Sequence, residues 1–225
     1  MRAAVPLLLA RCSARAIRAT RKNIVGAFDS VLKQGCDGIE FDVRRTKCGN
    51  AVVCVSAKVG TKAISQLTRA ELPGLPLLED ALRRNGDRVF LDIELKVPGL
   101  EPRVVAALRH RPPQSYVVSS ASPAVIMELK ARSGFVSVGI ICSKPRQLMA
   151  WRTLPVEYIM VHAELLTRRL IQLVHSAGKR VFAWAVNDKN SMLRLANWGV
   201  DGIISDDTHL LVQTLGRARP VRSVA

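Results

Sequence analysis

The chain has 225 residues, 48% of them hydrophobic, with 34 Lys and Arg against 18 Asp and Glu and a formal net charge of +16. This length and apolar content suit one large α/β domain, and no apolar run reaches the roughly 18 residues that a membrane-spanning helix needs. The charge favours anionic partners: phosphate compounds, nucleic acid or an acidic membrane surface. Aromatic residues make up 4% of the chain and no zinc-finger or RNA-recognition motif occurs, so no specific nucleic-acid partner is expected.

The N-terminal region and the cysteines bear on the compartment. The first 22 residues contain five Arg and one Lys and precede the first acid, Asp29, a composition that resembles an organelle transit peptide. Residues 4–10 are also typical of a buried strand. We prefer this interpretation because the barrel fold inferred below needs a first strand there. The five cysteines form no CxxC pair and are odd in number, which argues against a disulfide framework or a structural zinc site. We therefore expect a cytoplasmic protein, with organelle targeting as the alternative.

Short apolar runs alternate with amphipathic segments along the whole chain. Eight runs are typical of buried strands: residues 5–10, 38–43, 89–96, 116–120, 136–142, 158–162, 181–186 and 202–205. Helical patterns lie between and after them, at residues 23–35, 76–86, 101–110, 122–134, 144–152, 164–178, 188–199 and 206–216. Eight strands that are each followed by a helix predict an α/β fold, a closed parallel (β/α)8 barrel of the TIM type.

Residues 51–55 follow the second predicted strand too closely for a helical crossover. They are expected to fold back as one arm of a small hairpin, with Val55 about opposite Glu40. No linker, repeat or low-complexity tract divides the chain, so residues 1–216 are expected to form one domain. Residues 217–225 contain Pro and Arg without periodicity and are expected to form a flexible basic tail.

Acidic residues interrupt two predicted strands near their carboxyl ends, where such barrels place their active sites. Glu40 and Asp42 lie two apart in the second strand and therefore share a face. Asp92, Glu94 and Lys96 share a face of the third strand in the same way. Inward acids are costly unless they are paired or bind a metal, and their oxygens suit a hard cation such as Mg²⁺ or Ca²⁺. The alternative is a structural network in which the acids pair with Lys96 and nearby arginines.

Several motifs in sequence order carry a family resemblance. "DGIEFDVRRTKCGNAVV" (37–53) is similar to "DGIELDVxxTKDGxxVV", and "LPLLEDAL" (75–82) is similar to "IPTLEEVL". "LDIELK" is similar to "LNIEIK", "FAWAVND" to "WTVND" and "GVDGIISDD" to "GVDGIITD". With Asn23 and the "AF" of residues 27–28, similar to an "ENT..AF" helix start, the chain resembles the glycerophosphodiester phosphodiesterase family over nearly its whole length.

The resemblance implies a metal-dependent phosphoric diester hydrolase that cleaves glycerophosphodiesters to glycerol 3-phosphate and an alcohol. It implies that Glu40, Asp42 and Glu94 bind a divalent cation, Mg²⁺ or Ca²⁺. It also implies that Lys96 contacts the phosphate of this small-molecule ligand and that Trp184 shapes the substrate pocket at the barrel mouth. A plain core aromatic is the alternative for Trp184.

The chain departs from this family at the two histidines that serve there as general base and acid. One position falls near Ser13, or at Arg11 if a gap is allowed, and the other falls at Val55. A positioned acid or base contributes about 10²–10⁴-fold, and neither serine nor valine can supply it. His162 ends a predicted strand at the face where the site should lie and is the candidate surrogate. His110 and His175, near predicted helix ends, are expected at the surface, and His209 lies in the last predicted helix.

These departures leave three readings of the function. The first is an enzyme of this family with slow or altered chemistry. The second is a catalytically inactive barrel that binds a divalent cation and a phosphate ligand, as a sensor or scaffold. The third is binding to nucleic acid or an anionic membrane through the positive surface, which has only the net charge of +16 behind it.

Overall fold

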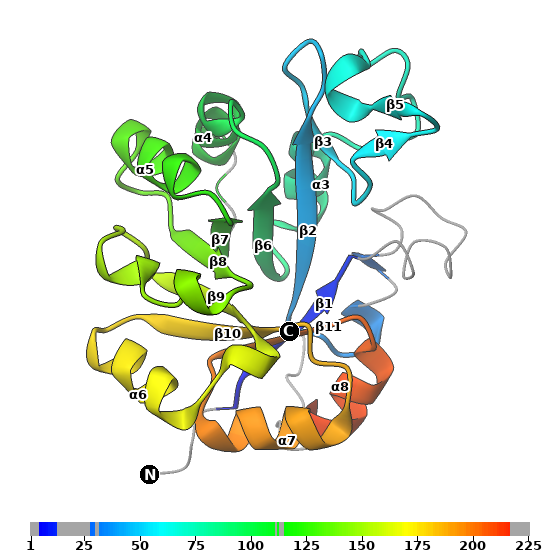
Figure 1. The fold of residues 1–225 in the computed structure, drawn as a ribbon. Helices are drawn as coiled ribbons and strands as arrows, with labels where there is room; N and C mark the ends of the chain where they lie inside the picture. The colour runs from blue at the N-terminus through cyan, green and yellow to red at the C-terminus, as the bar shows by residue number, and fades with distance from the viewer. Residues whose placement is uncertain (1–4, 13–27, 30–31, 111, 113–114, 217–225) are drawn as a thin grey trace.

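The computed structural model describes residues 5–12, 28–29, 32–110, 112 and 115–216 (Figure 1). Within them, parallel strands close into a barrel in the order β1-β2-β6-β7-β8-β9-β10-β11, with β11 pairing back to β1. The barrel strands are β1 (Leu7–Arg11), β2 (Gly38–Arg45), β6 (Phe90–Leu95), β7 (Tyr116–Ser120), β8 (Val138–Cys142), β9 (Tyr158–His162), β10 (Arg180–Trp184) and β11 (Gly202–Ser205). They coincide with the predicted apolar runs, which confirms the TIM-type (β/α)8 barrel. Near-continuous apolar strands fold this way because helices cover their outer faces.

The helices lie around the outside of the barrel (Figure 1). They are α3 (Leu78–Asn85), α4 (Glu101–His110), α5 (Pro123–Arg132), α6 (Arg168–Ser176), α7 (Lys189–Trp198) and α8 (Thr208–Leu215), with a 3₁₀ turn, η4 (Ala163–Leu165), before α6. Among the described residues, no helix combines the length and apolar character that crossing a membrane requires. The predicted helix start at residue 23, the position near Ser13 and the predicted tail at 217–225 lie outside the described residues.

The predicted helix at 144–152 is wrong. The segment forms two 3₁₀ turns instead, η2 (Pro145–Gln147) and η3 (Ala150–Arg152). Its apolar residues Leu148 and Trp151 are three apart, a spacing that suits the threefold turn of a 3₁₀ helix. The Gln147 side chain also accepts hydrogen bonds from the backbone N–H groups of two preceding residues, at 2.9 Å each, which holds the first turn in place.

A short antiparallel strand, β3 (Ala51–Val53), folds back on β2 as predicted. The register differs by one residue from the prediction, because the ladder pairs Val43 with Val53, whereas Val55 opposite Glu40 would pair Val43 with Val52. The cause is the turn, which is closed by a hydrogen bond from the Thr46 N–H to the Asn50 carbonyl. The turn from Thr46 to Asn50 is centred on Cys48, whereas the predicted turn was centred between Lys47 and Cys48, and this difference shifts the pairing by one residue.

The segment after β3 forms a small lobe beside the barrel mouth. It contains β4 (Lys58–Val59), β5 (Lys62–Ala63) and the 3₁₀ turn η1 (Ile64–Gln66), and its hairpin projects beyond the barrel (Figure 1). The lobe has its own apolar cluster of Val52, Cys54, Ile64, Leu67 and Leu72. This local core packs the segments that flank the hairpin.

Aromatic rings fill the barrel interior beneath the carboxyl ends of the strands. Phe90, Tyr158 and Phe182 contact one another with ring centroids 5.3–6.0 Å apart. Gly202 makes room for them, since a Cβ atom there would lie 2.8 Å from the Phe182 ring. The interior is therefore a packed core, and ligands of such barrels bind at the carboxyl-terminal ends of the strands.

Candidate functional site

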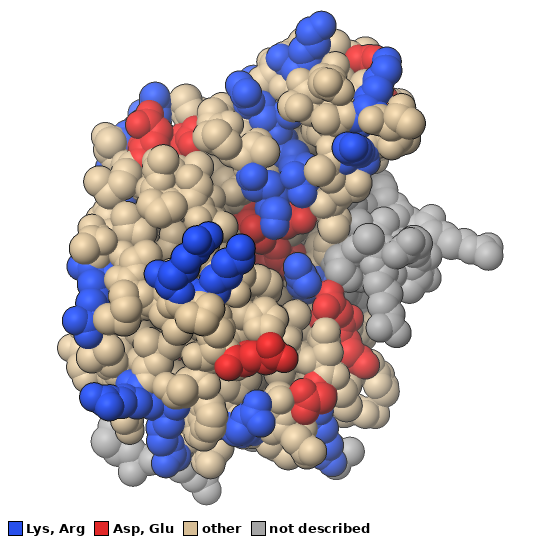
Figure 2. Space-filling view, in the orientation of Figure 1, with Lys and Arg blue, Asp and Glu red and all other residues tan. Residues whose placement is uncertain are grey.

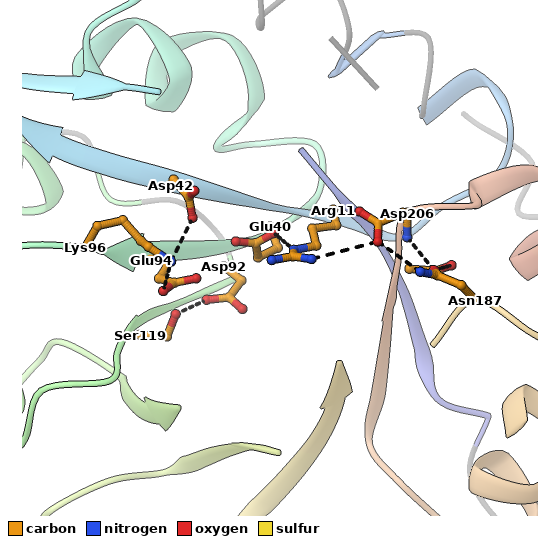
Figure 3. A network of polar contacts seen from close by, with 10 residues as sticks. Arg11, Glu40, Asp42, Asp92, Glu94, Lys96, Ser119, Asn187 and Asp206 are labelled. Atoms are coloured by element: carbon orange, nitrogen blue, oxygen red, sulfur yellow. Dashed lines mark hydrogen bonds and ion pairs between the residues drawn. The ribbon is translucent and has the colours of Figure 1, made fainter. Parts of the chain in front are cut away.

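Four acids converge at the carboxyl ends of β2 and β6 (Figure 3). The parallel register pairs Glu40 with Asp92 and Asp42 with Glu94, so the two strands present their acids side by side. Glu40 and Asp92 are only 5% and 2% exposed. One carboxylate oxygen from each of Glu40, Asp42 and Glu94 lies within 4.8 Å of the others, a spacing that suits a shared cation.

Two cationic side chains flank the acids (Figure 3). Lys96 Nζ lies 2.6 Å from Glu94 Oε1 and 3.6 Å from Asp42 Oδ1. Arg11, at the end of β1, has its Nε 3.8 Å from Glu40 Oε2. The structural network considered from the sequence is therefore present, and it lies on the same carboxylates that could bind a cation. From the sequence, Arg11 was predicted only as an alternative position for the first family histidine, if a gap is allowed.

The electrostatics of the acids reflect burial and mutual repulsion. Burial raises the pKa of Glu40 well above its ordinary range, and the charges of Asp42 and Asp92 raise it further. Burial also raises the pKa of Asp42 to about 6, although the nearby Lys96 charge opposes the rise. The pKa of Asp92 rises to about 7, again through burial and despite a hydrogen bond from Ser119.

Charge balance in the site leaves room for a cation. Burial alone would lower the pKa of Lys96, but the carboxylates of Glu94 and Asp42 outweigh it and raise that pKa. Among the described side chains drawn in Figure 3, four carboxylates around the cluster face only two cations, Lys96 and Arg11. Either protons or a divalent cation can compensate the remaining negative charge, and an all-oxygen donor set suits a hard ion.

A small cavity of about 20 Å³ opens beside the acids. Its lining consists of Arg11, Glu40, Asp92, Glu94, Ile141, Met160, Trp184 and Ile204. Acids and Arg11 form the polar part, apolar side chains of the barrel core form the rest, and Trp184 lies 5.9 Å from the Arg11 guanidinium carbon, measured to its ring centroid. Trp184 ends β10, lines this cavity and also packs against the barrel core.

The predicted surrogate, His162, lies at the mouth but outside the cavity lining. Its ring packs edge-on against Trp184 with the centroids 5.4 Å apart, and its Nδ1 lies 4.0 Å from Glu164 Oε2. His110 and His175 are exposed, as expected, and so is His209. His175 Nε2 lies 2.8 Å from Asp201 Oδ2. Among the described residues, no imidazole lines the cavity beside the acids.

The two positions at which the resemblance predicts a histidine differ in what surrounds them. Ser13 is not described, but Arg11 is the register partner of Glu40 and points into the site. Val55 is half-buried, and its carbonyl accepts a hydrogen bond of 3.1 Å from Arg44 Nη2. Arg44 Nε donates a second bond, also of 3.1 Å, to the Cys54 carbonyl and so holds the hairpin arm against β2.

Two further polar groups near the site, Ser119 and Asp206, were not predicted from the sequence as site residues. Ser119, on β7, donates a 2.6 Å hydrogen bond to Asp92 Oδ1. Asp206, after β11, accepts a 2.9 Å bond from Asn187 Nδ2 and lies 3.8 Å from Arg11 Nη1. A polar residue at the end of an otherwise apolar strand was the available signal in both cases, since strand ends meet at the mouth.

Comparison with known sequences gives a consistent set of matches. The sequence profile of the glycerophosphoryl diester phosphodiesterase family matches residues 15–104 and 96–210. A glycerophosphodiester phosphodiesterase of Caldanaerobacter subterraneus subsp. tengcongensis is 26% identical over 220 residues, which cover 85% of this chain and 90% of the relative. One from Bacillus altitudinis is 24% identical over 219 residues, covering 82% and 89%.

Solved structures share the fold. A phosphodiesterase from Oleispira antarctica, in complex with the product sn-glycerol-3-phosphate, superposes with a TM-score of 0.81 at 20% identity and covers 94% of this chain and 97% of that chain. A glycerophosphodiester phosphodiesterase from Parabacteroides distasonis gives a TM-score of 0.82 at 20% identity, with coverages of 96% and 99%. At this identity the likeness extends to the barrel architecture.

Proposed function

Because the chain belongs to the glycerophosphoryl diester phosphodiesterase family, we propose that its cavity binds a divalent cation and a glycerophosphodiester and hydrolyses the ester to glycerol 3-phosphate and an alcohol. The observation that carries the proposal is the convergence of Glu40, Asp42 and Glu94, whose oxygens lie within 4.8 Å of one another. The complex of the Oleispira antarctica phosphodiesterase with sn-glycerol-3-phosphate supports this class of ligand.

The donor set supports Mg²⁺ or Ca²⁺ as the cation. Glu40, Asp42 and Glu94 offer only carboxylate oxygens, which hard cations prefer over softer transition metals. When bound, the cation would supply electrostatic stabilisation of the charge that develops on the phosphoryl oxygens.

The chain's own residues would bind and orient the phosphodiester. Lys96, 29% exposed at its side chain, has donors to spare for a phosphate oxygen once a cation shares Asp42 and Glu94. Arg11 can offer its guanidinium from the opposite side of the acids. Trp184 and the apolar lining exclude water on the remaining sides of the cavity. These contacts favour a phosphate ligand at the acid cluster.

Proton transfer is the weak part of this proposed enzyme. Val55 carries no ionisable group, Arg11 does not lose its proton near neutral pH, and His162 packs on Trp184 at the cavity edge. We expect turnover to be slower by roughly 10²–10⁴-fold for each missing acid or base.

A second candidate is a binding barrel without turnover, acting as a sensor or scaffold. The observation that favours it is Arg11, which faces Glu40 at the end of β1 where a histidine is expected if the alignment carries a gap. An arginine there can bind an anion but cannot act as a general base.

One experiment separates the candidates. Glycerol 3-phosphate release from glycerophosphocholine is measured with Mg²⁺ or Ca²⁺ for the wild type, Glu40→Gln and the exposed rim control Glu164→Gln. Glycerol 3-phosphate binding is measured by calorimetry on the same proteins. Release lost only in Glu40→Gln supports the hydrolase, and cation-dependent binding without release supports the binding barrel. A wild-type protein that showed neither glycerol 3-phosphate release nor glycerol 3-phosphate binding would contradict both candidates.

A further inference from the structure

Charge is divided unevenly around the barrel mouth. The segments 44–77 and 143–153, which follow β2 and β8, carry Arg44, Arg45, Lys47, Lys58, Lys62, Arg69, Lys144, Arg146 and Arg152 and a single acid, Glu71. The segments after β9, β10 and β11 carry the acids Glu164, Asp188, Asp206 and Asp207. β2, β6, β7 and β8 are consecutive neighbours in the barrel. The two basic segments therefore lie at the two ends of one continuous side of the mouth.

Five of these cations form what we call the basic rim: Arg45, Lys47, Lys58, Lys144 and Arg146. All five are exposed, and none forms an ion pair with a carboxylate of the described residues. The space-filling view shows blue side chains gathered above and beside the red acids of the cavity, with further red groups lower on the same face (Figure 2). Unpaired cations around an opening attract anions that approach it.

Two apolar side chains project from the same segments. Val59, in the hairpin of the small lobe, is 46% exposed, and Met149, between η2 and η3, is 45% exposed. Val59 stands between Lys58 and Lys62, and nothing lies within 4 Å of a Cβ atom built on Gly60 beside it. The hairpin tip is therefore open to an approaching surface.

We propose that the basic rim, with Val59 and Met149, docks on an anionic phospholipid surface, so that the cavity mouth faces the lipid headgroups. Exposed apolar side chains among lysines and arginines suit the interface of an anionic bilayer, where the headgroups meet the cations and the apolar groups enter the acyl boundary. A nucleic acid would call instead for exposed aromatic rings that stack on bases, and Trp151, the aromatic residue of these segments, is 4% exposed.

The test measures vesicle binding and not turnover, so its failure is distinct from failure of the proposed hydrolase. Co-sedimentation is measured with vesicles of phosphatidylcholine mixed with phosphatidylglycerol and with vesicles of phosphatidylcholine alone. We expect binding only to the anionic vesicles, weakening as salt is added. No binding at low salt, or equal binding to both vesicles, would overturn the proposal.

Charge-reversal variants locate the surface. Lys58→Glu with Arg146→Glu should weaken vesicle binding by roughly tenfold or more, since each cation near an anionic bilayer contributes to binding. The matched control, Lys33→Glu with Arg109→Glu, makes the same charge change in exposed helical residues on the outside of the barrel. It should stay within about twofold of the wild type. An equal loss in both variants would mean a general charge effect and would overturn the proposal.

Apolar variants distinguish a bilayer from other polyanions. Val59→Ser with Met149→Ser should lower vesicle binding by roughly threefold or more and leave retention on heparin unchanged, because heparin has no apolar phase. Unchanged vesicle binding would contradict the role of these two side chains. If the wild type bound a DNA duplex more tightly than the anionic vesicles, the partner would be nucleic acid and the proposal would be wrong.

Discussion

Asp92 has an unusual position for an ionisable group. It is 2% exposed, lies beside Glu40 in the β2–β6 register and accepts a 2.6 Å hydrogen bond from Ser119. Burial raises its pKa from the ordinary 3.8 to about 7. In the folded protein its charged form is therefore costly until a cation or a proton compensates it.

Replacement of Asp92 by Asn should change the pH dependence of stability. Between pH 3.8 and about 7 the folded state holds the Asp92 proton and the unfolded state does not, so wild-type stability falls as pH rises through this window. Asp92→Asn removes the part of this fall that Asp92 contributes, leaves the parts due to Glu40 and Asp42, and keeps the acceptor for Ser119. The variant should gain stability above pH 7, on the order of 4 kcal/mol for a shift of this size, and little near pH 4.

Urea unfolding with a chelator present, at low and high pH, measures this effect. Glu128 of α5, which pairs with Arg132 at 2.6 Å, supplies the control, because Glu128→Gln leaves the acids of the barrel mouth in place. A wild type whose stability rises with pH through the same window would contradict the expected sign.

At the scale of elements, β2 organises the site. It pairs with β1 and β3 along one edge and with β6 along the other. Arg11 ends β1, and the N–H of the next residue, Cys12, donates a 2.9 Å hydrogen bond to the Glu40 carbonyl of β2. Cys54 follows β3, and its N–H donates a 3.0 Å hydrogen bond to the Asp42 carbonyl of β2. The ends of three strands therefore position the groups around the acid cluster.

Restoring imidazoles at these strand ends should raise hydrolysis. Arg11→His with Val55→His supplies two groups that titrate near neutral pH beside the acids, and a rate increase of about 10²–10⁴-fold in glycerol 3-phosphate release is expected. Because the observed pairing is one residue off the predicted one, Arg11→His with Ser56→His is the matched comparison. Adding Glu40→Gln should abolish the gain, and a gain that survives it would contradict the role of Glu40.

Arg44 should hold the hairpin arm in place. Its two hydrogen bonds of 3.1 Å reach the carbonyls of Cys54 and Val55. Arg44→Met should cost about 2 kcal/mol, the range for hydrogen bonds to a charged group, and should speed amide hydrogen exchange in residues 51–55. Arg45→Met is the control, since Arg45 is an exposed neighbour on the same strand. Equal exchange in the two variants would show that the bonds do not hold the arm.

At the scale of the whole molecule, the positive excess and the acid cavity are separate features. The chain carries a formal +16, yet its cavity gathers acids whose pKa values rise because they are buried together. The barrel fold keeps the acids apart from the surface cations, because inward side chains of the strands form the site and the loops form its rim. The cluster can therefore attract a cation while the rim attracts anions.

Cation binding should stabilise the whole fold. At a Mg²⁺ or Ca²⁺ concentration of about 100 times the Kd, binding to the folded state contributes about 2.7 kcal/mol. For a chain of this length that corresponds to a rise of roughly 5–10 °C in Tm, measured by calorimetry above pH 7. Glu94→Gln should remove most of the rise, while Glu164→Gln should keep it. The same rise in Glu94→Gln would contradict the assignment of the cluster.

Much of the barrel could be predicted because its signals are local. Apolar runs such as 158–162 are too continuous for a surface strand, and the period of two places Glu40 and Asp42 on one face. The segment 144–152 was predicted wrongly because its apolar spacing fits more than one kind of helix.

The sequence by itself determined the strand order of a closed barrel and the convergence of the acids of β2 and β6, because alternation along a strand and the common direction of parallel strands follow from the residues alone. The family resemblance, and not this alternation, singled out Glu40, Asp42 and Glu94 among them. Only the tertiary structure decided that Arg11 faces Glu40 and that His162 packs on Trp184 at the cavity edge. Those contacts depend on the stagger between neighbouring strands and on the register set by a turn, which hydrogen bonds between distant segments determine.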